Sequence, residues 1–157
     1  MTVKEFINQV FLDEYNRIVN QGFHYISFAL VGLGIEFLGG CLDPYDFGET
    51  RLSKARFTNA LKMLFPQGYQ QHSNALYEDL RSALAHQFRP GSRFWLTHSE
   101  ESQRENTQHL GAFKGGTVLI AENFYQDFSD ACKKVIEMID KGTLTHPKSS
   151  GQFLKIT

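Results

Sequence analysis

Arg81 and His86 are the two residues of this sequence whose types and spacing are best suited to chemistry. An arginine can hold a phosphate or stabilise a developing oxyanion, and a histidine can give or take a proton near neutral pH. The pair lies on a predicted helix, where five positions place the two side chains about 140° apart around the axis. They therefore border a shallow groove rather than forming a compact pair.

The helix that carries this pair is predicted over residues 71–87. It should end near residues 86–88, because Pro90 disfavours helix at the preceding residue and Gly91 lets the chain leave in any direction. Its expected core face consists of Leu76, Leu80, Ala83, Leu84 and Phe88, with Tyr77 at the edge. Glu78, Ser82 and Ala85 form the opposite strip. The simpler alternative is that Arg81 and His86 are solvated residues of an amphipathic helix.

Length and composition predict a single domain with its own core. The chain has 157 residues, of which 41% are hydrophobic, enough for one domain and too few for two ordinary ones. Sixteen Lys and Arg against 17 Asp and Glu give a formal net charge of −1, so any surface for nucleic acid has to be local. Two isolated cysteines and the lack of a signal-peptide pattern favour a reduced, cytoplasmic setting.

Hydrophobic periodicity predicts about five helices, at residues 3–20, 22–42, 51–65, 71–87 and 123–141, with Asn123 capping the last. Short runs between the last two predict a small β-hairpin or sheet, at residues 93–97, 109–113 and 116–121. The polar run 99–108 is expected to be a loop. The fold class is therefore a mainly α bundle over residues 1–142, with a β insertion around 92–121 and an extended tail over 143–157.

The predicted helix 22–42 has no Lys or Arg and approaches the length of a membrane span. His24, Glu36 and several glycines would be poor choices in hydrocarbon, so a buried core helix is expected and no membrane partner. Gly32 and Gly34 lack the setting of a dinucleotide fingerprint and should allow close helix packing. Glu36 needs a partner in so apolar a run. Arg81 is one candidate, and a solvated Glu36 at a helix end is the other.

A local basic stripe is predicted on helix 51–65, where Arg51, Lys54 and Lys62 project within a narrow arc. A phosphate backbone would suit it, although a merely solvated face is the simpler and preferred explanation. No metal or other cofactor is expected, because the histidines show no ligand spacing and the cysteines are isolated. His98, Arg104 and His109 are interpreted as surface residues. No nucleophile motif such as G-x-S-x-G occurs.

Residues 80–90, Leu-Arg-Ser-Ala-Leu-Ala-His-Gln-Phe-Arg-Pro, follow an apolar helix and resemble the signature of the HEPN superfamily. These proteins are α-helical bundles, named for higher eukaryotes and prokaryotes nucleotide-binding. Their signature is an arginine, four to six intervening residues and a histidine, often with a polar residue after the arginine. Arg81, Ser82 and His86 match these positions. The polar residue is commonly Asn, Asp or His, so Ser82 departs from the usual pattern.

The resemblance implies a metal-independent endoribonuclease that dimerises with its motif helices face to face. His86 would act as general acid or base for attack of a 2′-hydroxyl on the adjacent phosphate, Arg81 would neutralise the phosphorane-like charge, and Ser82 would orient one of them. The product would be a 2′,3′-cyclic phosphate. Residues expected to contact RNA are Arg51, Lys54, Lys62 and Arg89. A role in toxin–antitoxin growth arrest or phage defence would add an antitoxin or other protein partner.

Two alternatives remain open at this stage. Some members of the superfamily have lost activity, so the chain could be a HEPN-like domain that only binds nucleotide, RNA or a protein partner. The other alternative is an unrelated helical bundle in which Arg81 and His86 are ordinary surface residues.

Overall fold

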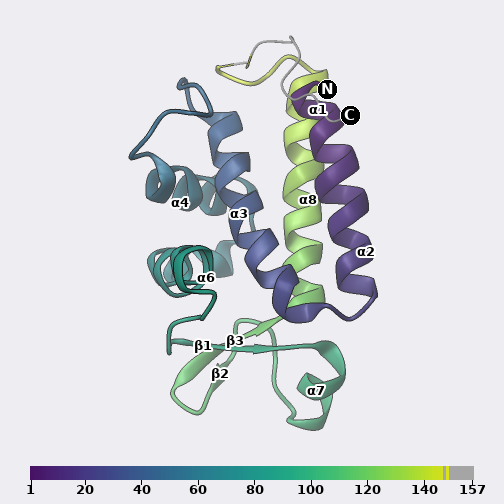
Figure 1. Cartoon of the computed structure of the whole chain (residues 1–157), viewed down its shortest axis with the longest axis vertical. Coiled ribbons are helices and arrows are strands. Elements are labelled where there is room, and N and C mark those ends of the chain that lie inside the picture. The colour runs from purple at the N-terminus through teal and green to yellow at the C-terminus, as the bar shows by residue number, and fades with distance from the viewer. Residues whose placement is uncertain (147, 149–157) are drawn as a thin grey trace.

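Helix α3 (His24–Leu42) is the element around which the other helices of this mainly α bundle pack. A computed structural model describes residues 1–146 and Lys148. In Figure 1, α8 (Ala121–Asp140) and the N-terminal helix run beside α3 on one side, and α4 (Ser53–Leu64) and α6 (Ala83–Gln87) lie on its other side. A small sheet lies at one end of the bundle. The predicted fold class, helical with a small sheet insertion, is confirmed.

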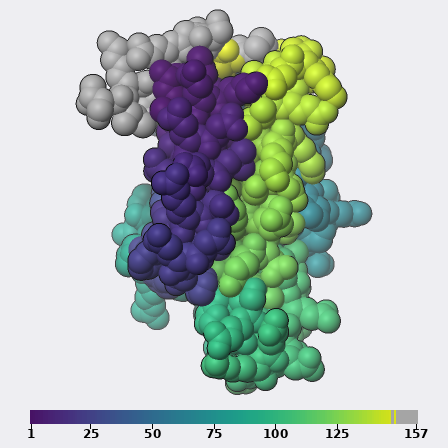
Figure 2. All heavy atoms as spheres, turned by 90° about the vertical axis from the view of Figure 1, so that its right-hand side faces the viewer, coloured from purple at the N-terminus to yellow at the C-terminus, as the bar shows by residue number. Residues whose placement is uncertain are grey.

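The N-terminal helix is continuous and consists of α1 (Val3–Phe6), the π-helical segment Ile7–Glu14 and α2 (Tyr15–Asn20). A capping box starts it. The Thr2 hydroxyl accepts a hydrogen bond from the Glu5 N–H, and the Glu5 carboxylate accepts one from the Thr2 N–H. Figure 2 shows this helix side by side with α8 on one face of the molecule, with the insertion at the lower end.

A second continuous helix, here called the motif helix, spans residues 73–87. It consists of α5 (Ser73–Ala75), the π-helical segment Leu76–Ser82 and α6, and a 3-10 turn, Gln67–His72, precedes it. Leu76, Leu80 and Leu84 are buried, as the periodicity predicts. The helix ends at Gln87 because Phe88 adopts the left-handed conformation, with φ of 52°. That turn carries Phe88 out of the predicted core face and leaves it 59% exposed, so its assignment to the core is wrong.

The α3 glycines allow its neighbours to approach closely, as expected. A Cβ at Gly39 would lie 2.0 Å from the Arg56 carbonyl oxygen in α4, and one at Gly34 would lie 2.4 Å from the ring of Phe128 in α8. At Gly32 it would touch the Arg81 backbone at 3.4 Å. By length and composition α3 could cross a bilayer, but 56% of its most apolar window is buried inside this fold, which is typical of a core helix.

The insertion contains three strands, β1 (Phe94–Thr97), β2 (Ala112–Phe113) and β3 (Gly116–Ile120), in the order β1-β3-β2. β1 pairs with β3 in parallel and β2 pairs with β3 antiparallel. The predicted loop 99–108 is wrong in part, because α7 (Ser99–Arg104) occupies its first half. Arg104 forms ion pairs one helical turn back with Glu100 and Glu101, which favours helix over loop.

The start of α8 also differs from the prediction. The helix begins at Ala121, directly after β3, and Ile120 rather than Asn123 occupies the cap position. Asn123 lies within the first turn and is exposed. The far end agrees with the sequence: the helix stops at Asp140, and Gly142 has a positive φ of 63°. Of the predicted tail 143–157, residue 147 and residues 149–157 lie outside the described part of the chain.

His109 attaches the insertion to the bundle, and its interpretation as a surface residue is wrong. Its Nδ1 accepts a hydrogen bond from the Ile120 N–H at 3.0 Å, so the proton of the neutral ring is on Nε2. That nitrogen lies 2.7 Å from the Tyr69 hydroxyl, which donates to Asp127 in α8 at 2.6 Å. Burial lowers the pKa of His109 to about 4, so the ring is neutral at physiological pH and serves packing and hydrogen bonding.

Gly39→Ala should destabilise the protein, although alanine favours a helix over glycine by about 1 kcal/mol. The added methyl would meet the backbone carbonyl of Arg56, which can move only if α4 shifts. Overpacking of this kind lowers the free energy of unfolding by about 1–3 kcal/mol, which urea denaturation can measure. Gly48→Ala is the control, since nothing lies within 4 Å of its Cβ position. Equal stability of Gly39→Ala and wild type would contradict the packing argument.

Candidate functional site

Arg81 lies against α3, where its charge is paired with Glu36. The Arg81 Nε is 2.5 Å from the Glu36 Oε2, and the two side chains are only 15% and 20% exposed. Of the two alternatives for Glu36, the structure therefore contains the pairing with Arg81. Among the described residues, the Arg81 Nε–H has no acceptor in hydrogen-bond geometry, so its contact with Glu36 is an ion pair and not an aligned hydrogen bond.

Ser53 of α4 and Tyr77 of the motif helix complete the surroundings of this pair. The Ser53 hydroxyl donates to the Glu36 Oε2 at 2.7 Å, and the Tyr77 hydroxyl donates to the Ser53 Oγ at 3.0 Å. The Arg81 guanidinium carbon lies 5.9 Å from the centre of the Tyr77 ring, within the range of a cation–π contact. Elements α3, α4 and the motif helix thus each contribute to holding Arg81 in one position.

A small cavity of about 220 Å³ adjoins Arg81, lined by Leu33, Glu36, Phe37, Phe47, Arg56 and Arg81. The second arginine of this cavity, Arg56, is buried and serves the loop before α4. It pairs with Asp43 at 2.6 Å and donates to the carbonyl oxygens of Asp46 and Phe47. Its charge is therefore committed to the fold, and Arg81 is the better placed of the two to meet an anion.

His86 lies in the last turn of the motif helix and is exposed. Among the residues that the structure describes, it has no hydrogen-bond or ion-pair partner. Ser82 is part-buried between the two signature residues, and its hydroxyl makes no hydrogen bond within the described chain. No contact joins Arg81 to His86, in agreement with their predicted separation around the helix. One chain therefore presents a fixed arginine and an uncommitted histidine, and not a closed acid–base site.

The turn that follows His86 is fixed by Asp79 and Arg93. The Asp79 carboxylate accepts hydrogen bonds from the Arg93 N–H at 3.0 Å, its Nε at 2.8 Å and its Nη2 at 2.6 Å. These bonds hold the pKa of Asp79 below its usual range. Gly91 donates its N–H to the Asp79 carbonyl oxygen, and a Cβ there would lie 2.2 Å from the Asp79 Cγ. The sequence shows the Pro90-Gly91 stop but gives no sign of this clamp.

Exposed apolar side chains border the motif helix. Leu33 is 41% exposed and lines the same cavity as Arg81. Beyond the helix end, the exposed rings of Tyr25 and Phe88 meet edge to face at 5.5 Å, and the Tyr25 hydroxyl donates to the Phe88 carbonyl oxygen. A surface of this composition next to the signature residues is suited to contact with another protein surface.

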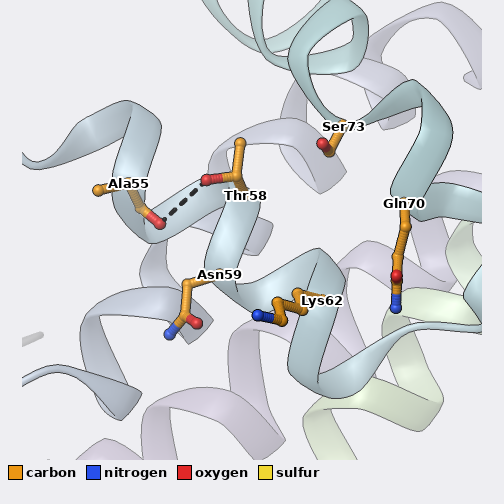
Figure 3. Close-up of a pocket in the computed structure, with 6 residues that line it drawn as sticks. All are labelled: Ala55, Thr58, Asn59, Lys62, Gln70 and Ser73. Carbon is orange, nitrogen blue, oxygen red and sulfur yellow. Dashed lines mark hydrogen bonds between the residues drawn. The ribbon is translucent and has the colours of Figure 1, made fainter.

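The residues expected to contact RNA do not all lie on α4. Helix α4 begins at Ser53 and not at Arg51, so Arg51 lies before the helix. Its backbone has a positive φ of 67°. Lys54 pairs with Glu78 at 3.2 Å, and Arg89 is exposed beyond the end of the motif helix. Lys62 lines a pocket of about 410 Å³ between α4 and the start of the motif helix (Figure 3). Its remaining lining residues are Ala55, Thr58, Asn59, Gln70 and Ser73.

Three residues that sequence reasoning missed lie together at the sheet end of the bundle. His24, His98 and Glu122 each offer a ligand atom, and these atoms lie within 4.8 Å of one another. They come from positions far apart in the chain, so no local spacing signals them. The geometry of these three side chains would suit a metal ion, although the spacing of the histidines in the sequence does not indicate one. Both cysteines are buried, and burial raises the pKa of Cys41 to about 12 and also raises the pKa of Cys132. Neither thiol is therefore a ready nucleophile, as the sequence predicts.

Comparisons of the chain with protein-family models, curated proteins and solved structures find no match. The chemistry of the site therefore has to follow from the residues themselves.

The Glu36–Arg81 pair should contribute measurable coupling energy. In a double-mutant cycle with Glu36→Gln and Arg81→Gln, we expect a coupling of about 1–2 kcal/mol, because the pair is largely withdrawn from water but not fully buried. Urea denaturation of the four proteins gives the value. The exposed pair of Arg17 and Asp13 is the matched control, with an expected coupling of about 0.5 kcal/mol or less. Equal coupling for both pairs would show that Arg81 is not held as described.

Proposed function

We propose that this protein is a metal-independent endoribonuclease of the HEPN type that acts as a homodimer through the motif helix. One observation supports the proposal most strongly: Arg81 is held in place by Glu36, while His86 on the same helix is exposed and has no partner in the described chain. A positioned cation and an uncommitted acid–base group are the two parts that metal-free RNA cleavage requires.

A dimer supplies what one chain lacks. Residues five apart on an ideal α-helix lie about 140° apart around its axis, so a second motif helix packed over Ser82 and Ala85 would bring two copies of Arg81 and of His86 around one groove. Both residues of this strip are small, which permits close approach. The exposed apolar side chains of Leu33, Tyr25 and Phe88 beside the helix would add buried area to the contact.

The chemistry in that groove would be transesterification. One His86 takes the proton of the 2′-hydroxyl, the 2′-oxygen attacks the adjacent phosphorus, and the 5′-oxygen of the next nucleotide leaves with a proton from the other His86. The Arg81 guanidinium offsets the extra negative charge of the pentacoordinate phosphorus, and Ser82 orients one of the two groups. The products are a 2′,3′-cyclic phosphate and a 5′-hydroxyl end. Arg89, which is exposed just beyond the helix, would contact the RNA backbone.

The same ion pair favours a second candidate, a non-catalytic HEPN-like domain that binds nucleotide, RNA or a protein partner. Glu36 neutralises part of the Arg81 charge, so a phosphate would have to compete with a carboxylate 2.5 Å away. A ribonuclease of this kind would act in the cytoplasm in growth arrest or phage defence, with an antitoxin as its partner. A binding domain would need only the fold and the dimer.

Purified protein should cleave structured or single-stranded RNA in excess chelator and leave cyclic phosphate ends. Arg81→Ala and His86→Ala should each lower the cleavage rate by about 100-fold or more, the usual size of an acid–base or charge-stabilising contribution. Arg104→Ala and His146→Ala are matched controls on exposed residues and should keep the wild-type rate.

The other outcomes separate the alternatives. Absence of cleavage with intact RNA binding would support the binding domain and contradict the ribonuclease. Cleavage by both the Arg81→Ala and the His86→Ala variant would contradict the assignment of these residues to the active site. Cleavage that requires added metal would contradict the metal-independent mechanism.

A further inference from the structure

We propose that His24, His98 and Glu122 bind a first-row transition metal ion, with Zn²⁺ as the preferred ion. The three ligands leave at least one coordination position open. This site is separate from the proposed ribonuclease groove and uses none of its residues. The three ligands come from the start of α3, the junction of β1 and α7, and the first turn of α8. Figure 1 shows these segments converging where the bundle meets the sheet.

The contacts among the three residues favour a cation between them. The His24 Nε2 lies 3.5 Å from the Glu122 Oε1, and the rings of His24 and His98 are stacked with centroids 4.6 Å apart. The other carboxylate oxygen, Oε2, accepts the Ser99 N–H at 2.9 Å. That bond fixes the carboxylate and directs Oε1 toward the histidines, in the manner of the outer-shell contacts that orient metal ligands.

The charge balance of the cluster also favours a bound ion. Glu122 has no Lys or Arg partner among the described residues, so its carboxylate is not neutralised by a permanent cation. Neither side chain is fully buried, with His24 25% and Glu122 37% exposed, so an ion can reach the cluster from solvent. A divalent cation would satisfy the carboxylate and two imidazole lone pairs at once.

The donor set selects the kind of metal. Two imidazoles and one carboxylate suit Zn²⁺ and its first-row neighbours, whereas Ca²⁺ and Mg²⁺ prefer oxygen ligands alone. Zinc held by three protein ligands keeps a fourth position for water or another small ligand, unlike the closed four-ligand structural sites. The open position is suited to a water molecule or an anionic group.

Binding requires a small closure of the cluster. Tetrahedral zinc with bonds of about 2.0–2.1 Å separates its ligand atoms by roughly 3.3 Å, while these atoms lie within 4.8 Å of one another. Parallel rings do not aim their lone pairs at one point, so His24 and His98 have to rotate about their side-chain bonds out of the stack. The ion would then link three chain segments and fasten the insertion to the bundle.

Zinc titration against a chromophoric chelator tests the site, and the visible spectrum of a Co²⁺-loaded sample reports the ligand set. We expect one ion per chain and a melting temperature that rises with zinc. His24→Ala, His98→Ala and Glu122→Gln should each weaken binding by about 100-fold or more, because loss of an outer-shell contact alone weakens it about 10–100-fold. His146→Ala and Glu14→Gln, both on exposed residues, are the controls and should bind as wild type.

Glu122→Gln keeps an acceptor for the Ser99 N–H and is therefore expected to fold. It tests the site even if a histidine variant fails to fold. Failure of the wild type to compete with the chelator would overturn the proposal. Equal binding by wild type and Glu122→Gln, or a Co²⁺ spectrum that the histidine substitutions leave unchanged, would also overturn it. RNA cleavage measured in excess chelator is independent of these results, so the two proposals can fail separately.

Discussion

The close approach of α4 and α8 to two glycines of α3 is the constraint on which the rest of this structure depends. Gly39 admits the backbone of α4 and Gly34 admits the Phe128 ring of α8, at distances that a methyl group would prevent. The motif helix also lies against α3, where a Cβ at Gly32 would make ordinary contact with the Arg81 backbone at 3.4 Å. Glu36, one turn further along α3, pairs with the Arg81 guanidinium. Helix α3 therefore contributes both to the packing of the core and to the position of Arg81.

This arrangement gives Arg81 and His86 different surroundings. Arg81 is fixed by an ion pair and a neighbouring tyrosine ring, and His86 is exposed at a helix end whose following turn is clamped by Asp79 and Arg93. Arg81 and His86 make no contact with each other within one chain. In the proposed dimer, two copies of the helix would bring an arginine of one chain near a histidine of the other, and the exposed apolar side chains beside the helix would add to that contact. The function proposed above therefore depends on the dimer as much as on the residues.

Features that depend on local sequence could be predicted, and features that depend on distant contacts could not. The Thr2–Glu5 capping box, the buried leucines of the motif helix and its stop before Pro90 follow from neighbours within a few positions. The burial of His109 depends on Tyr69 and Asp127, far away in the chain, and the cluster of His24, His98 and Glu122 joins three elements. Helix boundaries were also missed by a few residues, which removed Arg51 from α4 and Asn123 from its capping role.

The distance between the two motif helices tests the central claim most directly. A spin label at Ala85→Cys would lie on the small-residue strip, and the native cysteines, both buried, would remain unlabelled. With helix axes about 8–10 Å apart, pulsed electron paramagnetic resonance should give one narrow distance of about 20 Å or less between the two chains. A label at the exposed Gln103 of α7 should give a longer distance. A chain that stays monomeric, or a longer distance at residue 85 than at residue 103, would contradict the composite site.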